Sequence, residues 1–179
     1  MTVTKLFRKI RLGELEIDLE ELEGFLVAAK RNGYAGGEGK KREADGSKTF
    51  TYQEGNFHYT DNYAGSYQAP GNEIVRWQKD DGQRIWYMAY SGGMLPAFRH
   101  NDILSENTFK FLKEVLMLVT PELPFRGPLR HENTGFEYLL EINGDIKRFS
   151  GGEIIRSKRL KDVVFSQDLI GGLVIPKIK

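Results

Sequence analysis

The chain has 179 residues, 40% of them hydrophobic and 28% charged, a composition typical of one folded domain with a well-buried core. Its 26 Lys and Arg residues against 25 Asp and Glu give a net charge of +1, which argues against direct nucleic-acid binding and against attraction to anionic lipid. The absence of cysteine excludes disulfides, thiolate metal ligands and a cysteine nucleophile.

The first residues, MTVTKLFRKIRLGELEIDL, are basic but lack the apolar run of a signal peptide, and no window of the chain resembles a membrane span. We therefore expect a cytoplasmic protein that does not enter a membrane. We predict that residues 1–17 form an N-terminal extension and that residues 18–179 form a single α+β domain.

The stretch DLEELEGFLVAAKRNG predicts an amphipathic helix. Asp18 can cap its start, Glu21 completes a capping-box pattern, and Gly33 suits its C-terminal end. The apolar residues recur at helical spacing on one stripe: Leu19, Leu22, Leu26 and Ala29.

Strand signals follow in FTYQEGNFHYTDNY, where Gly55-Asn56 suits a two-residue hairpin turn. This turn pairs Tyr52 with Tyr59 and Phe50 with Asp61 on one face. The polar face then pairs Gln53 with His58, Thr51 with Thr60 and Thr49 with Asn62. A slip of one residue would mix the aromatic and polar sets, so their separation supports the assumed turn.

A second hairpin is predicted at Asp81-Gly82, a favoured turn dipeptide. It places three pairs on one face: Trp77 with Trp86, Val75 with Met88 and Glu73 with Tyr90.

The stretch SENTFKFLKEVLMLV predicts a second helix, with Ser105 as its cap and Glu106 in its first turn. Its apolar stripe runs until Pro121 and consists of Phe109, Leu112, Leu116 and Val119.

A third hairpin is predicted at Asn143-Gly144, with Tyr138 opposite Phe149, and EIIRSKRLKDVVF predicts one or two further strands. Tight turns between consecutive strands favour an antiparallel sheet. We therefore predict an α+β fold, with a mainly antiparallel sheet built from successive hairpins and two principal helices packed on one face.

Two carboxylates fall on the face that the pattern assigns to the interior, Asp61 and Glu73. An unpaired ionised carboxylate is costly to desolvate, so each needs a cationic partner, a hydrogen-bond donor or a ligand. One interpretation is a concave pocket whose candidate ligand contacts are Tyr52, Tyr59, Asp61, Tyr63, Glu73, Trp86 and Tyr90. The alternative is that both acids lie at strand ends where the sheet meets water.

We expect no metal and no cofactor, since His58 and the pair His100 and Asp102 lack a third spaced ligand. No G-x-S-x-G elbow supports a serine hydrolase, and the residue types identify no catalytic residue. The turn PELPFRGPLR could bring Arg126 and Arg130 towards the sheet.

An ordered series of segments resembles the bacterial and archaeal domain-of-unknown-function family 5680: GFLVAAKRNGYAGG, GSKTFTYQEGNFHYTDNY, WYMAYSGGM, ELPFRGP and FSQDLIGGLV. The similarity spans roughly Leu19 to Val174. The resemblance implies an effector-sensing module, because such domains often follow an Xre-like helix-turn-helix regulator. About eighteen residues precede the first helix here, fewer than a DNA-binding domain needs. The family supplies no catalytic residues.

The favoured function is a module that binds or senses a small polar or cationic ligand through the aromatic face and the two carboxylates. One alternative is a metal-independent, hydrolase-like enzyme that uses Asp61 and Glu73 as an acid/base pair. Another is a protein-interaction domain with an exposed sheet edge or apolar patch. Homo-oligomerisation stays open.

Overall fold

The computed structural model describes residues 8–34 and 40–177. Within them the chain forms two α-helices, a short 3-10 helix η2 (Pro96–Phe98) and two antiparallel sheets, which confirms the predicted α+β class. The helices are α1 (Leu19–Tyr34) and α2 (Asp102–Leu116). The strands are β1 (Lys9–Leu12), β2 (Leu15–Asp18), β3 (Lys40–Arg42), β4 (Lys48–Glu54), β5 (Phe57–Tyr63), β6 (Gly71–Trp77), β7 (Arg84–Met94), β8 (Arg130–Glu132), β9 (Phe136–Asp145), β10 (Arg148–Ser157) and β11 (Asp162–Leu173).

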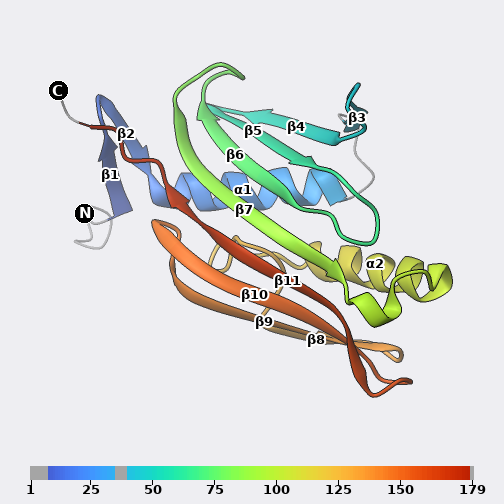
Figure 1. Ribbon diagram of the computed structural model, residues 1–179. Coiled ribbons are helices and arrows are strands. Elements are labelled where there is room, and N and C mark those ends of the chain that lie inside the picture. The colour runs from blue at the N-terminus through green and yellow to red at the C-terminus, as the bar shows by residue number, and fades with distance from the viewer. Residues whose placement is uncertain (1–7, 35–39, 178–179) are drawn as a thin grey trace.

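The larger sheet has nine strands in the order β3-β4-β5-β6-β7-β11-β10-β9-β8. Figure 1 shows that this sheet is strongly twisted and that α1 and α2 lie on one side of it. Both edge strands are only three residues long, so β3 covers only residues 48–50 of β4 and β8 covers only residues 137–139 of β9. The core lies between the helices and the sheet face that carries Tyr59, Trp86 and Phe165.

Strands β1 and β2 form a separate hairpin that leads directly into α1. Its Leu12 and Ile17 side chains are buried and belong to the hydrophobic core. The Gln83 side-chain amide donates to the Leu12 carbonyl oxygen at 3.1 Å. The part of the predicted N-terminal extension that the structure describes therefore packs on the rest of the chain.

Helix α1 begins where the sequence predicts, because the Asp18 carboxylate accepts a hydrogen bond from the Glu20 backbone N–H at 2.9 Å. All four residues of its predicted apolar stripe are buried. The assignment of Gly33 to the C-terminal stop is wrong, since α1 continues to Tyr34. A Cβ atom at position 33 would lie 3.0 Å from the Phe50 ring, so glycine there permits close packing of the helix on β4.

Helix α2 begins three residues before the predicted cap, Ser105. Asn101 is the actual cap, and its side-chain oxygen accepts from the Leu104 backbone N–H at 3.1 Å. Ser105 is buried inside the helix.

The first predicted hairpin is correct in every pair. Tyr52 lies opposite Tyr59, Phe50 opposite Asp61, and the three polar pairs lie on the other face. Gly55 has φ +56°, a left-handed conformation that glycine adopts without strain and that this tight turn requires.

The second hairpin is displaced along the strand, and all three predicted pairs are wrong: Trp77 with Trp86, Val75 with Met88 and Glu73 with Tyr90. The structure instead pairs Val75 with Trp86, Glu73 with Met88 and Gly71 with Tyr90. Gln78 adopts φ +66° and the Trp77 N–H donates to the Gln83 carbonyl at 2.9 Å, so the connection is longer than two residues. The pairing is displaced by two residues. Because side chains alternate between the faces with every residue, a displacement by an even number leaves each side chain on its predicted face.

The third hairpin also turns later than predicted. Strand β9 continues through Asn143 and Gly144, and Tyr138 lies opposite Ile155 rather than Phe149. The Asp145 carboxylate accepts from the Lys147 N–H at 2.9 Å and thereby stabilises the actual turn. Strands β10 and β11 account for the further strands that the sequence predicts near the end of the chain.

Gly92 on β7 allows the close approach of β11, because a Cβ atom there would lie 2.2 Å from the Ser166 carbonyl oxygen. We predict that Gly92→Ala lowers the free energy of unfolding by about 1–3 kcal/mol, as overpacking does in other cores. Gly152→Ala is the matched control, because its Cβ would meet its nearest atom at 3.3 Å. Urea denaturation of both variants checks this, and equal losses would contradict it.

Candidate functional site

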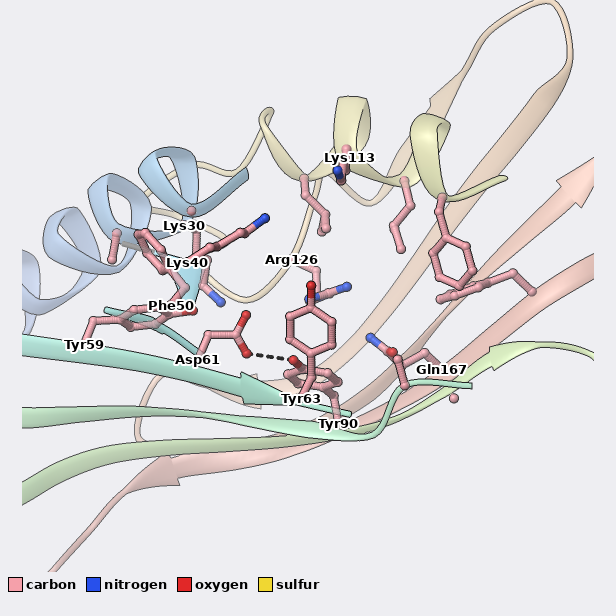
Figure 2. A pocket seen from close by; sticks show the side chains of 18 residues that line it. Lys30, Lys40, Phe50, Tyr59, Asp61, Tyr63, Tyr90, Lys113, Arg126 and Gln167 are labelled. Atoms are coloured by element: carbon pink, nitrogen blue, oxygen red, sulfur yellow. Dashed lines mark hydrogen bonds between the residues drawn. The ribbon is translucent and has the colours of Figure 1, made fainter. Parts of the chain in front are cut away.

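A cavity of about 140 Å³ lies between α1, α2 and the inner face of the sheet. Its apolar wall includes Phe50, Phe109, Leu112, Leu116 and Phe165. Polar and charged side chains line the remainder: Lys30, Lys40, Asp61, Tyr63, Lys113, Arg126 and Gln167. Figure 2 shows these groups converging from both helices and from the sheet.

Four of the seven predicted ligand contacts line this cavity: Tyr59, Asp61, Tyr63 and Tyr90. They come from β5 and β7, which are not adjacent strands, since β6 lies between them. The side-chain alternation read from the sequence brings them to one face, and the sheet order brings them together.

The other three predicted contacts lie outside the cavity. Tyr52 packs on Phe25 of α1 with ring centroids 5.8 Å apart, and its hydroxyl donates to Glu54 at 2.5 Å. Trp86 is fully buried, and its indole N–H donates to the Ile146 carbonyl at 3.2 Å. Glu73 lies beneath the cavity, in an ion pair with Lys30.

The Lys30–Glu73 ion pair joins α1 to β6 in the protein interior, and both side chains are fully buried. The Lys30 ammonium also donates to the Phe125 carbonyl at 2.8 Å. Burial lowers the pKa of Lys30, and the Glu73 carboxylate opposes this shift. The alternative of a solvated strand end is therefore wrong for Glu73. Sequence reasoning missed Lys30, although it stands one helical turn after the buried Leu26, a position at which a lysine signals a buried partner.

A second buried ion pair joins Arg126 to Glu153 of β10, with the guanidinium Nη2 and Nε atoms 2.9 and 3.1 Å from Oε1. Gln167 donates to the same oxygen at 2.9 Å, and the Tyr138 hydroxyl donates to Oε2 at 2.6 Å. The Arg126 guanidinium also lies 5.5 Å from the centre of the Tyr90 ring. The expectation that Arg126 approaches the sheet is correct. Its partner Glu153 was not among the predicted site residues.

Asp61 is partly buried, and its Oδ1 atom accepts a hydrogen bond from the Tyr90 hydroxyl at 2.7 Å. Glu73 faces it from the neighbouring strand. Burial and the Glu73 charge raise the pKa of Asp61 from 3.8 to about 6, against the opposing effects of Tyr90, Lys30 and Arg126. The pKa of Tyr90 is raised well above its usual value by burial and by Asp61. Asp61 is thus a carboxyl group that can change protonation state near neutral pH.

Among the described residues, no three His, Asp or Glu side chains are grouped so that they could hold a metal ion. In the same part of the chain, neither helix has the length and apolar character needed to cross a bilayer.

We predict that Lys30→Met lowers the free energy of unfolding by roughly 3 kcal/mol or more, because it leaves the Glu73 charge buried without its partner. Adding Glu73→Gln to this variant should recover part of the loss, since it removes that charge. Lys79→Met, which breaks an exposed pair with Asp81, is the control and should change stability by less than about 0.5 kcal/mol. Additive losses in the double variant, measured by chemical denaturation, would refute the coupling.

We predict that Asp61→Asn stabilises the protein above pH 6 by up to roughly 3 kcal/mol, the free energy that corresponds to the raised pKa of Asp61. The raised pKa of Asp61 means that the folded state binds this proton more tightly than the unfolded state does, so stability falls as pH rises from 3.8 to about 6. The advantage of the variant should therefore shrink towards pH 4. Urea denaturation across this range checks the prediction, with Asp168→Asn on the exposed side of β11 as control. A difference that is constant with pH would contradict it.

The sequence profile of one family, described as domain of unknown function (DUF5680), matches residues 61–174. The match excludes α1, β3 and β4, although the resemblance in the sequence was expected to begin at Leu19. It includes β6, β7, α2 and the strands that follow, and therefore most of the elements around the cavity. No curated protein and no solved structure matches the chain. Because the profile covers more than half of its residues, the chain belongs to the DUF5680 family.

Proposed function

We propose that this domain binds a small polar organic molecule in the cavity between α1, α2 and the sheet. The observation that carries the proposal is the position of Asp61, a carboxyl group with a raised pKa in the wall of a cavity that combines apolar and aromatic side chains with a few polar and cationic ones. Ligand sites commonly combine such an apolar wall with a few convergent polar groups.

The size of the cavity supports a ligand with about one ring. Its volume of about 140 Å³ is close to that of a buried cavity of about 150 Å³ that accepts benzene in another protein. The rings of Phe50 and Tyr59 and the apolar side chains of α2 supply apolar contact, and Tyr63 and Gln167 supply groups that can form hydrogen bonds.

We include a sensing role in this proposal, because the resemblance to the DUF5680 family implies domains that often follow a helix-turn-helix regulator in the same chain. The absence of cysteine supports a reducing compartment such as the cytoplasm.

A thermal-shift screen of a library of small polar metabolites tests the proposal. The wild-type protein should be stabilised by particular compounds, because a ligand that binds only the folded state raises the melting temperature. Ala69→Phe should abolish these shifts, since Ala69 is a half-buried residue that lines the cavity and a larger side chain there would fill it. Hits that stabilise this variant equally would place binding elsewhere, and a screen without any hit would count against a binding function.

An acid/base enzyme is the second candidate, favoured by the pKa of about 6 that burial gives Asp61. Glu73 cannot be the other half of a catalytic pair that touches a substrate, because it is fully buried and lies outside the cavity. Asp61 would act alone, beside the Tyr90 hydroxyl. Turnover of a library hit that is lost in Asp61→Asn, with binding retained, would favour the enzyme. Binding without turnover would favour the sensing module.

A further inference from the structure

We propose that the ligand is a small organic anion whose apolar body is about one ring in size, and that its anionic group lies between Lys40, Lys113 and Asp61. This inference rests on the proposed binding function and names the chemical class of the ligand. It replaces the cationic ligand that the aromatic residues and carboxylates suggest in the sequence alone.

The charges around the cavity favour an anion. Four cationic side chains line it, Lys30, Lys40, Lys113 and Arg126, and Asp61 is the only carboxylate among the lining residues. Glu73 and Glu153 lie behind the wall and neutralise Lys30 and Arg126. The remaining positive charges are the two lysines, so a cationic ligand would meet net repulsion and an anionic ligand net attraction.

Lys40 and Lys113 flank the cavity from different elements, the edge strand β3 and helix α2. Neither lysine has an ion-pair partner within the described residues. Burial and the nearby Lys113 charge both lower the pKa of Lys40. An anion bound between the two ammonium groups would offset their mutual repulsion, so the two lysines favour an anionic ligand at this end of the cavity.

In this site Asp61 would be the group whose protonation is coupled to ligand binding. Tyr90 occupies its Oδ1 atom, and no other described side chain donates a hydrogen bond to its carboxyl group. In Figure 2 the second carboxyl oxygen of Asp61 points away from Tyr90, towards the helix side of the cavity. A ligand carboxylate placed beside it would favour the protonated acid, which can donate its O–H to the ligand.

The charged and titratable groups that face Asp61 determine whether ligand binding takes up or releases a proton. Glu73 on β6 favours protonation, whereas Lys30 on α1, Arg126 and the Tyr90 hydroxyl on β7 favour the carboxylate. Lys40 and Tyr63 also face Asp61. An added negative charge shifts this balance towards the protonated form, so anion binding should take up a proton and strengthen as pH falls.

Calorimetric titration with three probes of one shape tests the ligand class: benzoate, benzamide and benzylamine. At pH 7 and low salt, benzoate should bind at least about tenfold more tightly than benzamide, and benzylamine more weakly than either. Inorganic phosphate should bind more weakly than benzoate, because it lacks the apolar body. Lys113→Gln should bring the affinity for benzoate down to that for benzamide and leave benzamide unchanged. Lys147→Gln, which removes the same charge from the β9–β10 turn, should change neither.

The pH dependence is the second measurement. The affinity for benzoate should rise several-fold from pH 7.5 to pH 5.5, and this rise should disappear in Asp61→Asn. Equal binding of benzoate and benzamide, or a preference for benzylamine, would overturn the inference and leave the proposed binding function intact. Failure of all three probes would also overturn it, and the metabolite screen with Ala69→Phe would then decide separately whether the cavity binds other ligands.

Discussion

The buried ion pair between Lys30 and Glu73 constrains the arrangement of the whole cavity. A lysine and a glutamate without exposed surface are tolerated only as partners, because removing either charge from water without the other is costly. The pair therefore holds α1 at one position on β6, and the additional bond to the Phe125 carbonyl holds the segment before Arg126 at the same place. Helix, sheet and connecting segment meet at one ammonium group.

The second pair, Arg126 with Glu153, extends this constraint to the other half of the sheet. Glu153 accepts hydrogen bonds from Arg126, Gln167 and Tyr138, so its carboxylate is well satisfied. Asp61 differs from both glutamates in the charge of its donor: each glutamate is paired with a cation, whereas the one described side chain that donates to Asp61 is the neutral Tyr90 hydroxyl. The cavity thus lies above two ion pairs, whose carboxylates do not line it, and beside one carboxyl group that does line it and has no cationic hydrogen-bond donor among the described side chains. This contrast is the reason to assign binding to Asp61 and structural support to Glu73.

Of the three hairpin registers predicted from turn dipeptides, only the first is observed in the structure. Gly55-Asn56 gave the correct register, because a tight turn with a left-handed glycine leaves little freedom for the flanking strands. Asp81-Gly82 and Asn143-Gly144 are equally good turn dipeptides, yet the first lies in a longer loop and the second within β9. Pairing across the rest of the sheet overrode these local preferences. Both displacements are even, so the face of each side chain was still predicted correctly.

Alternation of side chains and helical spacing were sufficient to derive the α+β class, the two helices, and the aromatic face with Asp61 on it. These features depend on neighbours within a strand or a helix, which a sequence displays directly. The cavity itself depends on contacts between distant segments: Lys30 reaches Glu73, Arg126 reaches Glu153, and Lys40 and Lys113 line the same cavity as Asp61. No local pattern encodes those distances, because they follow from the order of nine strands and the placement of two helices on them. The excess of positive charge at the cavity, and with it the class of ligand that we propose, emerges only when these segments are folded together.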